Sequence, residues 1–241
     1  MIVEHGCGGA IARGMGPIAA LLALLSLLPN QVRADGFELF MRSGYAPAMG
    51  KVVGGGSDGS DNLNRFVAAQ VPFWLDVGYR FADRIFVGAY VQLGLGINGQ
   101  SLKDSCSGVP RAHCSTEDFR LGMQSHVHLL PEETLDPWIG YGFGYERMSS
   151  SITQGSAESS MTFQGYELAN FQAGLDVLIA GSIRVGPFIS FSLGQYSRAV
   201  IDCLGSGCSS SYPTTLKVTD KALHEWLLIG VRGGFAHKNR E

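Results

Sequence analysis

The chain has 241 residues, 45% of them hydrophobic, with 18 Lys+Arg against 21 Asp+Glu and a formal net charge of −3. This balance gives no basis for binding nucleic acid. Glycine, with 33 residues, is about twice as frequent as usual. Beyond residue 34 no helical periodicity is evident, and no apolar run approaches the roughly 20 residues of a membrane-spanning helix. Composition therefore favours an all-β protein, either soluble or embedded in a membrane as a barrel.

Residues 1–34 are expected to be a signal peptide. Arg13 precedes an apolar run over 18–28, Pro29 follows the run, and cleavage is expected after Ala34. The run is too short for a helical membrane anchor. Residues 35–241 then form a single exported domain.

Four of the five cysteines remain after this processing, and they form two close pairs. In an oxidising exported compartment, Cys106–Cys114 and Cys203–Cys208 are the expected disulfides. A metal site is the alternative, but no His/Cys set has the spacing of zinc ligands. We therefore expect no metal and no cofactor.

Alternation with a period of two marks strands that have two different faces. Within 85–96 the odd positions are aliphatic, whereas the even positions are small, aromatic or polar. Eight such segments are predicted, at about 36–46, 70–80, 84–96, 117–129, 137–149, 163–178, 182–198 and 223–236. Long and short connections take turns between them, which predicts an all-β, eight-stranded antiparallel up-and-down transmembrane β-barrel.

A soluble barrel of the lipocalin type is the alternative architecture. Here, however, the charged face of each segment also holds the glycines, and the aliphatic face would overfill a small lumen. The aliphatic face is therefore predicted to contact lipid, where an open sheet edge would leave backbone groups unpaired. Aromatic residues near the strand ends are predicted to form interfacial girdles on this face: Phe37, Tyr45, Phe73, Tyr79, Tyr141, Phe143, Tyr145 and Phe235.

The opposite face carries charged residues that are predicted to form an ion-pair network inside the lumen. The network comprises Glu38, Arg42, Asp76, Arg80, Arg120, Glu146, Asp176, Arg184 and Arg232. Buried charges need opposite partners, and an eight-stranded interior holds only side chains or something small. A filled lumen is therefore predicted. Gln92, Gln124, His126 and His128 also face inward, and a proton-linked site at the two histidines is the alternative to simple packing.

No catalytic site is expected. Ser125 and His126 point to opposite faces of their strand, and the chain has no Gly-x-Ser-x-Gly motif. We interpret the hydroxyl-rich stretch 149–160 as a flexible surface loop, and the Gly/Asp-rich stretch 54–61 as a solvated loop rather than a calcium site.

Three segments carry a family resemblance: Asp-Val-Gly-Tyr-Arg at 76–80, Asp-Pro-Trp-Ile-Gly-Tyr-Gly-Phe-Gly-Tyr-Glu at 136–146, and 186–194. They resemble the small outer-membrane β-barrels of Gram-negative bacteria, the OmpA/OmpX/OmpW-like superfamily, over essentially all of 36–236. The resemblance implies contact with outer-membrane lipid and insertion by the outer-membrane assembly machinery.

The expected role is structural or interactive, with disulfide-pinned extracellular loops that meet a partner. A narrow transporter or a binding barrel for a small solute is the alternative.

Overall fold

The computed structural model describes residues 34–55, 61–205, 208 and 212–236. The predicted signal peptide lies outside these residues, apart from Ala34, as does the centre of the 54–61 segment. In the part of the chain that is described, no helix combines the length and apolarity needed to cross a membrane.

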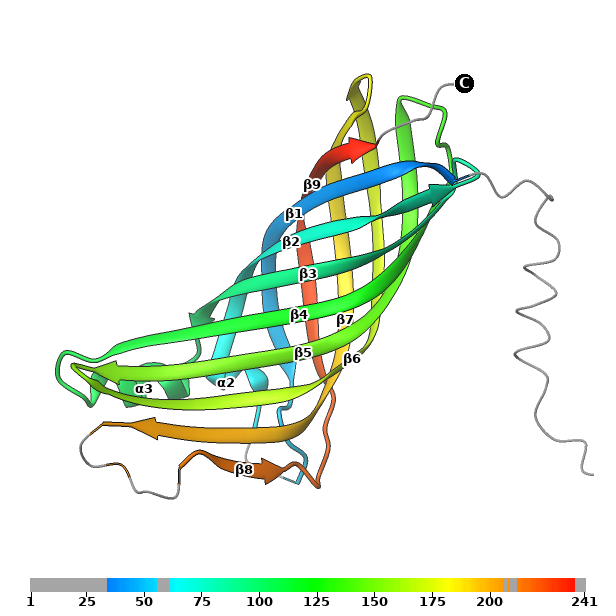
Figure 1. Cartoon of the computed structure of the whole chain (residues 1–241). Helices are drawn as coiled ribbons and strands as arrows, with labels where there is room; N and C mark the ends of the chain where they lie inside the picture. The colour runs from blue at the N-terminus through cyan, green and yellow to red at the C-terminus, as the bar shows by residue number, and fades with distance from the viewer. Residues whose placement is uncertain (1–33, 56–60, 206–207, 209–211, 237–241) are drawn as a thin grey trace, which may run out of the picture. The chain divides into compact units, whose positions relative to one another are not determined.

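Eight strands pair in an antiparallel ring, which confirms the predicted barrel (Figure 1). Each of β1 to β7 pairs with its neighbour along the chain, and β9 closes the ring by pairing with both β1 and β7. The ring strands are β1 (Ala34–Gly50), β2 (Val67–Phe81), β3 (Ile85–Asn98), β4 (His113–His128), β5 (Leu135–Gln154), β6 (Ala157–Ala180), β7 (Ile183–Leu204) and β9 (His224–Ala236).

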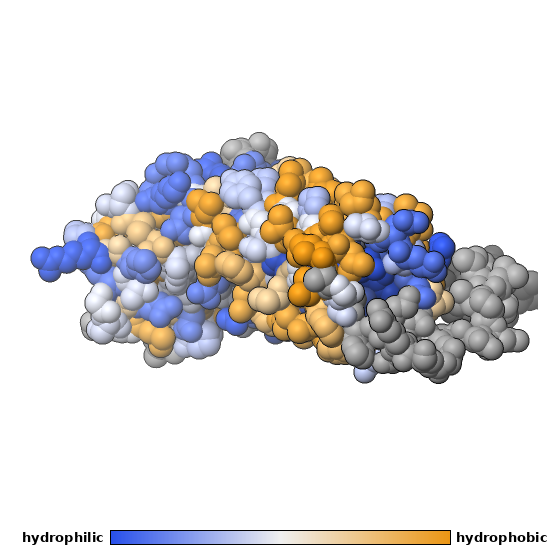
Figure 2. Space-filling model, turned by 90° about the horizontal axis from the view of Figure 1, so that it is seen from above, coloured by the Kyte–Doolittle hydropathy of each residue, from blue (hydrophilic) through white to orange (hydrophobic). Residues whose placement is uncertain are grey.

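The outer face of the ring carries a belt of exposed apolar side chains, here called the apolar belt. Its members include Leu39, Met41, Val77, Leu121, Ile139, Phe171, Val185, Ile229 and Val231. Figure 2 shows apolar residues gathered across the middle of the face in view, with hydrophilic residues toward the ends. Water-facing strands rarely expose so much contiguous apolar surface, whereas lipid-facing strands do.

All eight aromatic residues of the predicted girdles are exposed on this outer face. Phe37 and Tyr79 are cross-strand partners near the start of β1, with ring centroids 5.9 Å apart. Tyr145 pairs with Tyr166 toward the opposite end of the barrel. Tyr141 and Phe143 differ from the prediction, because they lie between these two levels in the middle of β5.

The prediction of a flexible surface loop at 149–160 is wrong. β5 continues to Gln154, the chain turns at 155–156, and β6 starts at Ala157. The hydroxyl side chains pair across the strands, as Ser149 Oγ and Thr162 Oγ1 do at 2.9 Å. For the same reason the strict alternation of long and short connections fails here, since this connection is a two-residue turn.

The sheet therefore continues past the apolar belt. Beyond the ring, a short strand β8 (Thr214–Lys217) takes the place of β9 beside β7. We call the part of β4–β8 that projects past the ring the extension; Figure 1 shows it at the end of the barrel opposite the described end of the last strand.

Two short helices accompany the strands in the described part of the chain, although no helical periodicity is evident in the sequence beyond residue 34. They are α2 (Leu63–Phe66) and α3 (Gln100–Ser107). Helices of one or two turns repeat no apolar position often enough to show a period, and they are stabilised by packing rather than by propensity.

Candidate functional site

The lumen holds the predicted ion-pair network. All nine predicted residues are at most 9% exposed, and so are the inward-facing Gln92, Gln124, His126 and His128. Their contacts group into three layers along the barrel axis, which we call lower, middle and upper, starting from the end at which β1 begins and β9 ends.

The lower layer is centred on Asp136. This carboxylate lies 2.8 Å from Arg184 and 3.5 Å from Arg80, and His128 Nδ1 is 2.7 Å away. Arg80 also pairs with Glu38 at 2.7 Å. Two arginines thus face two carboxylates in this layer.

The middle layer offsets the repulsion within one pair of like charges. Arg42 and Arg232 are direct cross-strand partners, an arrangement that by itself is destabilising. Each guanidinium turns to its own acid instead: Arg42 lies 2.6 Å from Asp76, and Arg232 pairs with Asp176. Both cations also lie over indole rings, Arg232 at 3.8 Å from the Trp138 ring and Arg42 at 4.1 Å from the Trp74 ring.

Amide side chains connect this layer across the lumen. Arg42 on β1 donates to Gln172 on β6 at 2.7 Å and to Gln124 on β4 at 2.6 Å. Gln124 in turn donates to Asp76 at 2.8 Å. Contacts between strands on opposite sides of the ring mean that the interior positions are occupied by side chains.

The upper layer places one arginine among three carboxylates. Arg120 lies 2.9 Å from Asp118, 3.0 Å from Glu167 and 3.3 Å from Glu146. Glu146 also accepts hydrogen bonds from Tyr196 at 2.9 Å and Trp226 at 3.2 Å, and contacts His224 at 2.9 Å. The carboxylates of this layer are held by neutral donors as well as by the single guanidinium.

Four acidic or histidine members of these layers escaped the sequence prediction: Asp118, Asp136, Glu167 and His224. Asp118 shares the inward parity of Arg120, so alternation could have identified it. His224 likewise shares the inward parity of Arg232 within the predicted segment 223–236, whereas Asp136 lies at a strand end, where predicted boundaries are least accurate.

Glu167 was hidden by a β-bulge in β6. Gly144 pairs with Glu167 and Gly142 with Asn170, so one extra residue stands opposite Phe143. The bulge shifts the inward parity from odd to even between Glu167 and Asn170, both of which are buried. Simple alternation cannot place both residues inside.

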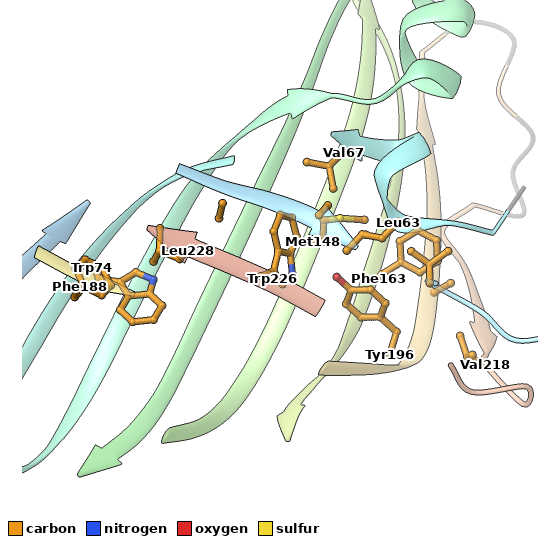
Figure 3. Packing of buried hydrophobic residues seen from close by; sticks show 14 of the residues in the cluster. Leu63, Val67, Trp74, Met148, Phe163, Phe188, Tyr196, Val218, Trp226 and Leu228 are labelled. Atoms are coloured by element: carbon orange, nitrogen blue, oxygen red, sulfur yellow. The ribbon is translucent and has the colours of Figure 1, made fainter. Parts of the chain in front are cut away.

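Above the upper layer, apolar side chains close the mouth of the barrel. We call this group the apolar plug; it consists of Leu63, Val67, Met148, Phe163, Tyr196 and Trp226 (Figure 3). Leu63 of α2 is fully buried, and the rings of Phe163 and Tyr196 lie 5.5 Å apart. The short helix α2 thus contributes a side chain to the barrel interior.

Both inward histidines lie near the Trp138 ring, and His128 in addition contacts Asp136 of the lower layer. The His126 ring lies 5.0 Å from the Phe86 ring and 4.7 Å from the Trp138 ring, with Nε2 3.1 Å from Gln172. No group of three His, Cys, Asp or Glu side chains among the described residues is placed to hold a metal.

Ser125 pairs with the belt-facing Val87 and Tyr141, on the outward side of the sheet. The absence of enzymatic activity stays a prediction.

Both cysteine pairs are bonded in the structure. Cys106 in α3 is joined to Cys114 in β4, and Cys203 in β7 is joined to Cys208 just after that strand. Each bond thus links a strand of the extension to the connection beside it, rather than two loop positions.

The outer face of the extension carries a polar groove of about 300 Å³. Hydroxyl and charged side chains dominate it: Ser115, Glu117, Arg147, Ser149, Ser151, Glu158, Ser160, Thr162, Gln164 and Asp202. This composition is suited to hydrated, hydrogen-bonding contact rather than to lipid.

Comparison with known proteins gives structural matches alone. No family profile matches the chain, and no curated protein matches it. Among solved structures it resembles a major outer membrane protein from Thermus thermophilus, with a TM-score of 0.50 and 6% identity over 83% of this chain and 99% of that one.

Two further barrels are similar. Neisserial surface protein A has a TM-score of 0.45 and 12% identity, with 81% of this chain and 95% of that chain covered. The attachment invasion locus protein Ail of Yersinia pestis has a TM-score of 0.40 and 13% identity, with 83% of this chain and 99% of that chain covered. The structural neighbours are thus small outer-membrane β-barrel proteins, and at these identities the likeness concerns the fold.

Proposed function

We propose that this chain is an exported outer-membrane β-barrel of a Gram-negative bacterium, of the OmpA/OmpX/OmpW-like kind, that anchors the extension outside the cell for contact with a partner. The composition of the extension is the observation that supports this proposal. Strands β4 to β7 run past the apolar belt, and their outer face exchanges aliphatic residues for hydroxyl and charged ones.

Orientation follows from the connections. Three of them at the end where β1 begins are short, at 82–84, 129–134 and 181–182, whereas the extension lies at the other end. Outer-membrane barrels place their short turns in the periplasm and their longer segments outside. The extension and both disulfides therefore belong on the extracellular side in this proposal.

The lumen is proposed not to conduct. Three layers of side chains contact one another across the ring, and the apolar plug occupies the mouth above them. These contacts favour an anchoring role over the alternative of a narrow transporter.

Cysteine labelling on intact cells tests the orientation. Ser156→Cys places a thiol at the tip of the β5–β6 hairpin, and Ser182→Cys places one in the β6–β7 turn. We expect a membrane-impermeant maleimide to label the first variant and to leave the second unlabelled until the cells are broken. Labelling of Ser182→Cys alone on intact cells contradicts the proposal.

Conductance in planar bilayers tests the closed lumen. We expect no discrete current steps from the purified barrel, and regular steps would favour the transporter instead.

A variant with 150–161 replaced by a two-residue turn should keep the barrel and lose adhesion of the expressing cells to immobilised partners.

A further inference from the structure

We infer that a cavity beneath α3 is a binding site for one small apolar molecule that carries a hydroxyl group. The cavity has a volume of about 230 Å³ and lies between the two helices and the strands β5, β6 and β7. Five apolar side chains line it: Phe66, Leu102, Ile152, Met161 and Ile201. It occupies the face of the extension opposite the polar groove.

The helix α3, which covers this cavity, is attached to the rest of the extension at both of its ends. At the start of α3, Arg65 Nε donates to Ser101 Oγ at 3.0 Å, and the Gly99 N–H donates to the Phe66 carbonyl at 2.9 Å. A Cβ at Gly99 would collide with the Arg65 backbone, so glycine permits this close approach. Near the end of α3, the Cys106–Cys114 disulfide joins the helix to β4. The cavity therefore has fixed walls on the helical side as well as on the sheet.

The size of the cavity selects a small molecule. The cavity is open to solvent on one side, where Ser105 and Ser159 are exposed, and an apolar cavity of about 150 Å³ is enough to bind benzene. A space of about 230 Å³ thus admits one ring with a short substituent. It is too small for a folded partner or a peptide segment with several side chains.

The lining selects the chemistry of the ligand. None of the described residues that line the cavity is charged, so an ion would be bound without a counter-charge. The Phe66 ring, which meets Phe163 edge to face at 5.8 Å, offers an aromatic wall. Ser150 and Ser159, the latter a cross-strand partner of Ile152, supply hydroxyls that can pair with one polar group. A benzyl alcohol or phenol type of molecule satisfies these requirements.

Methionine methyl NMR provides the test, because the chain has methionines in the cavity and in the apolar belt. The barrel is labelled with methyl-¹³C methionine, placed in lipid nanodiscs and titrated with benzyl alcohol. We expect the Met161 signal, assigned with Met161→Leu, to shift and saturate. Met41 and Met123, at 65% and 48% exposure in the belt, should drift without saturation as the alcohol enters the lipid. A Met161 signal that drifts like theirs overturns the inference.

Variants on one strand sharpen the test. Ile152→Trp fills the cavity and should raise the dissociation constant at least tenfold, whereas Ile139→Trp, on the same strand in the belt, should leave it unchanged. Should Ile152→Trp fail to fold, the Cys106→Ser/Cys114→Ser variant should weaken binding because α3 loses its tie to β4. Unchanged saturable binding in a folded variant of either kind overturns the inference.

The inference rests on the proposed function in one respect only, namely that the extension lies outside the lipid. Its failure would leave the labelling and conductance results untouched.

Discussion

At the scale of single residues, the lumen shows how charges can be buried in a small barrel. Taking an arginine or a carboxylate out of water costs several kcal/mol per ion, and this cost is offset only when partners and hydrogen bonds are complete. Asp136 illustrates the requirement, since Arg80, Arg184 and His128 all converge on it. Removal of such a hub leaves Arg184 without its carboxylate partner and leaves Arg80 with Glu38 alone.

We therefore expect Asp136→Asn to reduce the free energy of unfolding by about 3–5 kcal/mol. The amide keeps the shape of the side chain but cannot neutralise the two arginines. Urea unfolding from lipid vesicles, followed by tryptophan fluorescence, measures the effect. Glu132→Gln, an exposed change in the neighbouring turn, is the matched control and should cost almost nothing. A loss below about 1 kcal/mol in Asp136→Asn would contradict this account.

The upper layer predicts a different response, because Arg120 stands alone among Asp118, Glu146 and Glu167. Arg120→Met should destabilise the barrel by about 3 kcal/mol at pH 8, since three buried carboxylates then repel one another. Protonation removes that repulsion, so the deficit relative to the unmodified chain should shrink as the pH falls to 5.

Thermal unfolding of the two proteins across this pH range measures the effect. The exposed Arg147→Met is the control and should show no such trend. A deficit for Arg120→Met that does not change with pH would show that repulsion between the carboxylates is not its cause.

At the scale of elements, the bulge in β6 sets which side chains reach the lumen. Leu168 has no pairing partner on either neighbouring strand. On the β7 side, Glu167 and Ala169 pair with the consecutive residues Gly194 and Leu193. On the other side, β5 has one residue fewer than β6 over the same stretch. Leu168 and Ala169 consequently lie side by side outside the lumen, and the two inward residues on either side keep their orientation.

Deletion of Leu168 should therefore be tolerated, because it restores regular pairing without moving any inward residue to the outer face. We expect a cost of about 1 kcal/mol and unchanged heat-modifiable migration on a denaturing gel. Deletion of Phe171, a regular belt residue three positions later, exchanges the two faces for the adjoining part of β6. That variant should fail to fold, and equal behaviour of the two deletions would contradict the assigned bulge.

At the scale of the whole molecule, the apolar belt determines where the barrel can reside. Val231 lies in the middle of β9, 62% exposed, between Ile229 and Phe235 on the same face. A soluble barrel would not keep such side chains in contact with water, whereas lipid stabilises them.

Val231→Arg should weaken folding into lipid vesicles by about 2–4 kcal/mol, the cost of an arginine at the bilayer midplane. Leu216→Arg, an exposed apolar position on β8 in the extension, is the control and should insert normally. Equal penalties would mean that the apolar belt does not define the membrane-embedded zone.

Much of this fold could be predicted from the sequence, because the two faces of a strand follow from a period of two that any short window contains. That pattern alone predicts that Glu38, Arg42 and Asp76 face the lumen, and the structure buries all three. The number of ring strands followed in the same way.

The order of the amino acids therefore specifies which residues face inward and which face outward within each regular strand. Other features depend on contacts in the folded chain: the bulge at Leu168, the hairpin at 149–160, the position of α3, and the partner that each buried charge finds across the ring. The physical reason is one of range. Alternation is a local property of the backbone, whereas register, bulges and cross-lumen contacts depend on strands far apart in the chain.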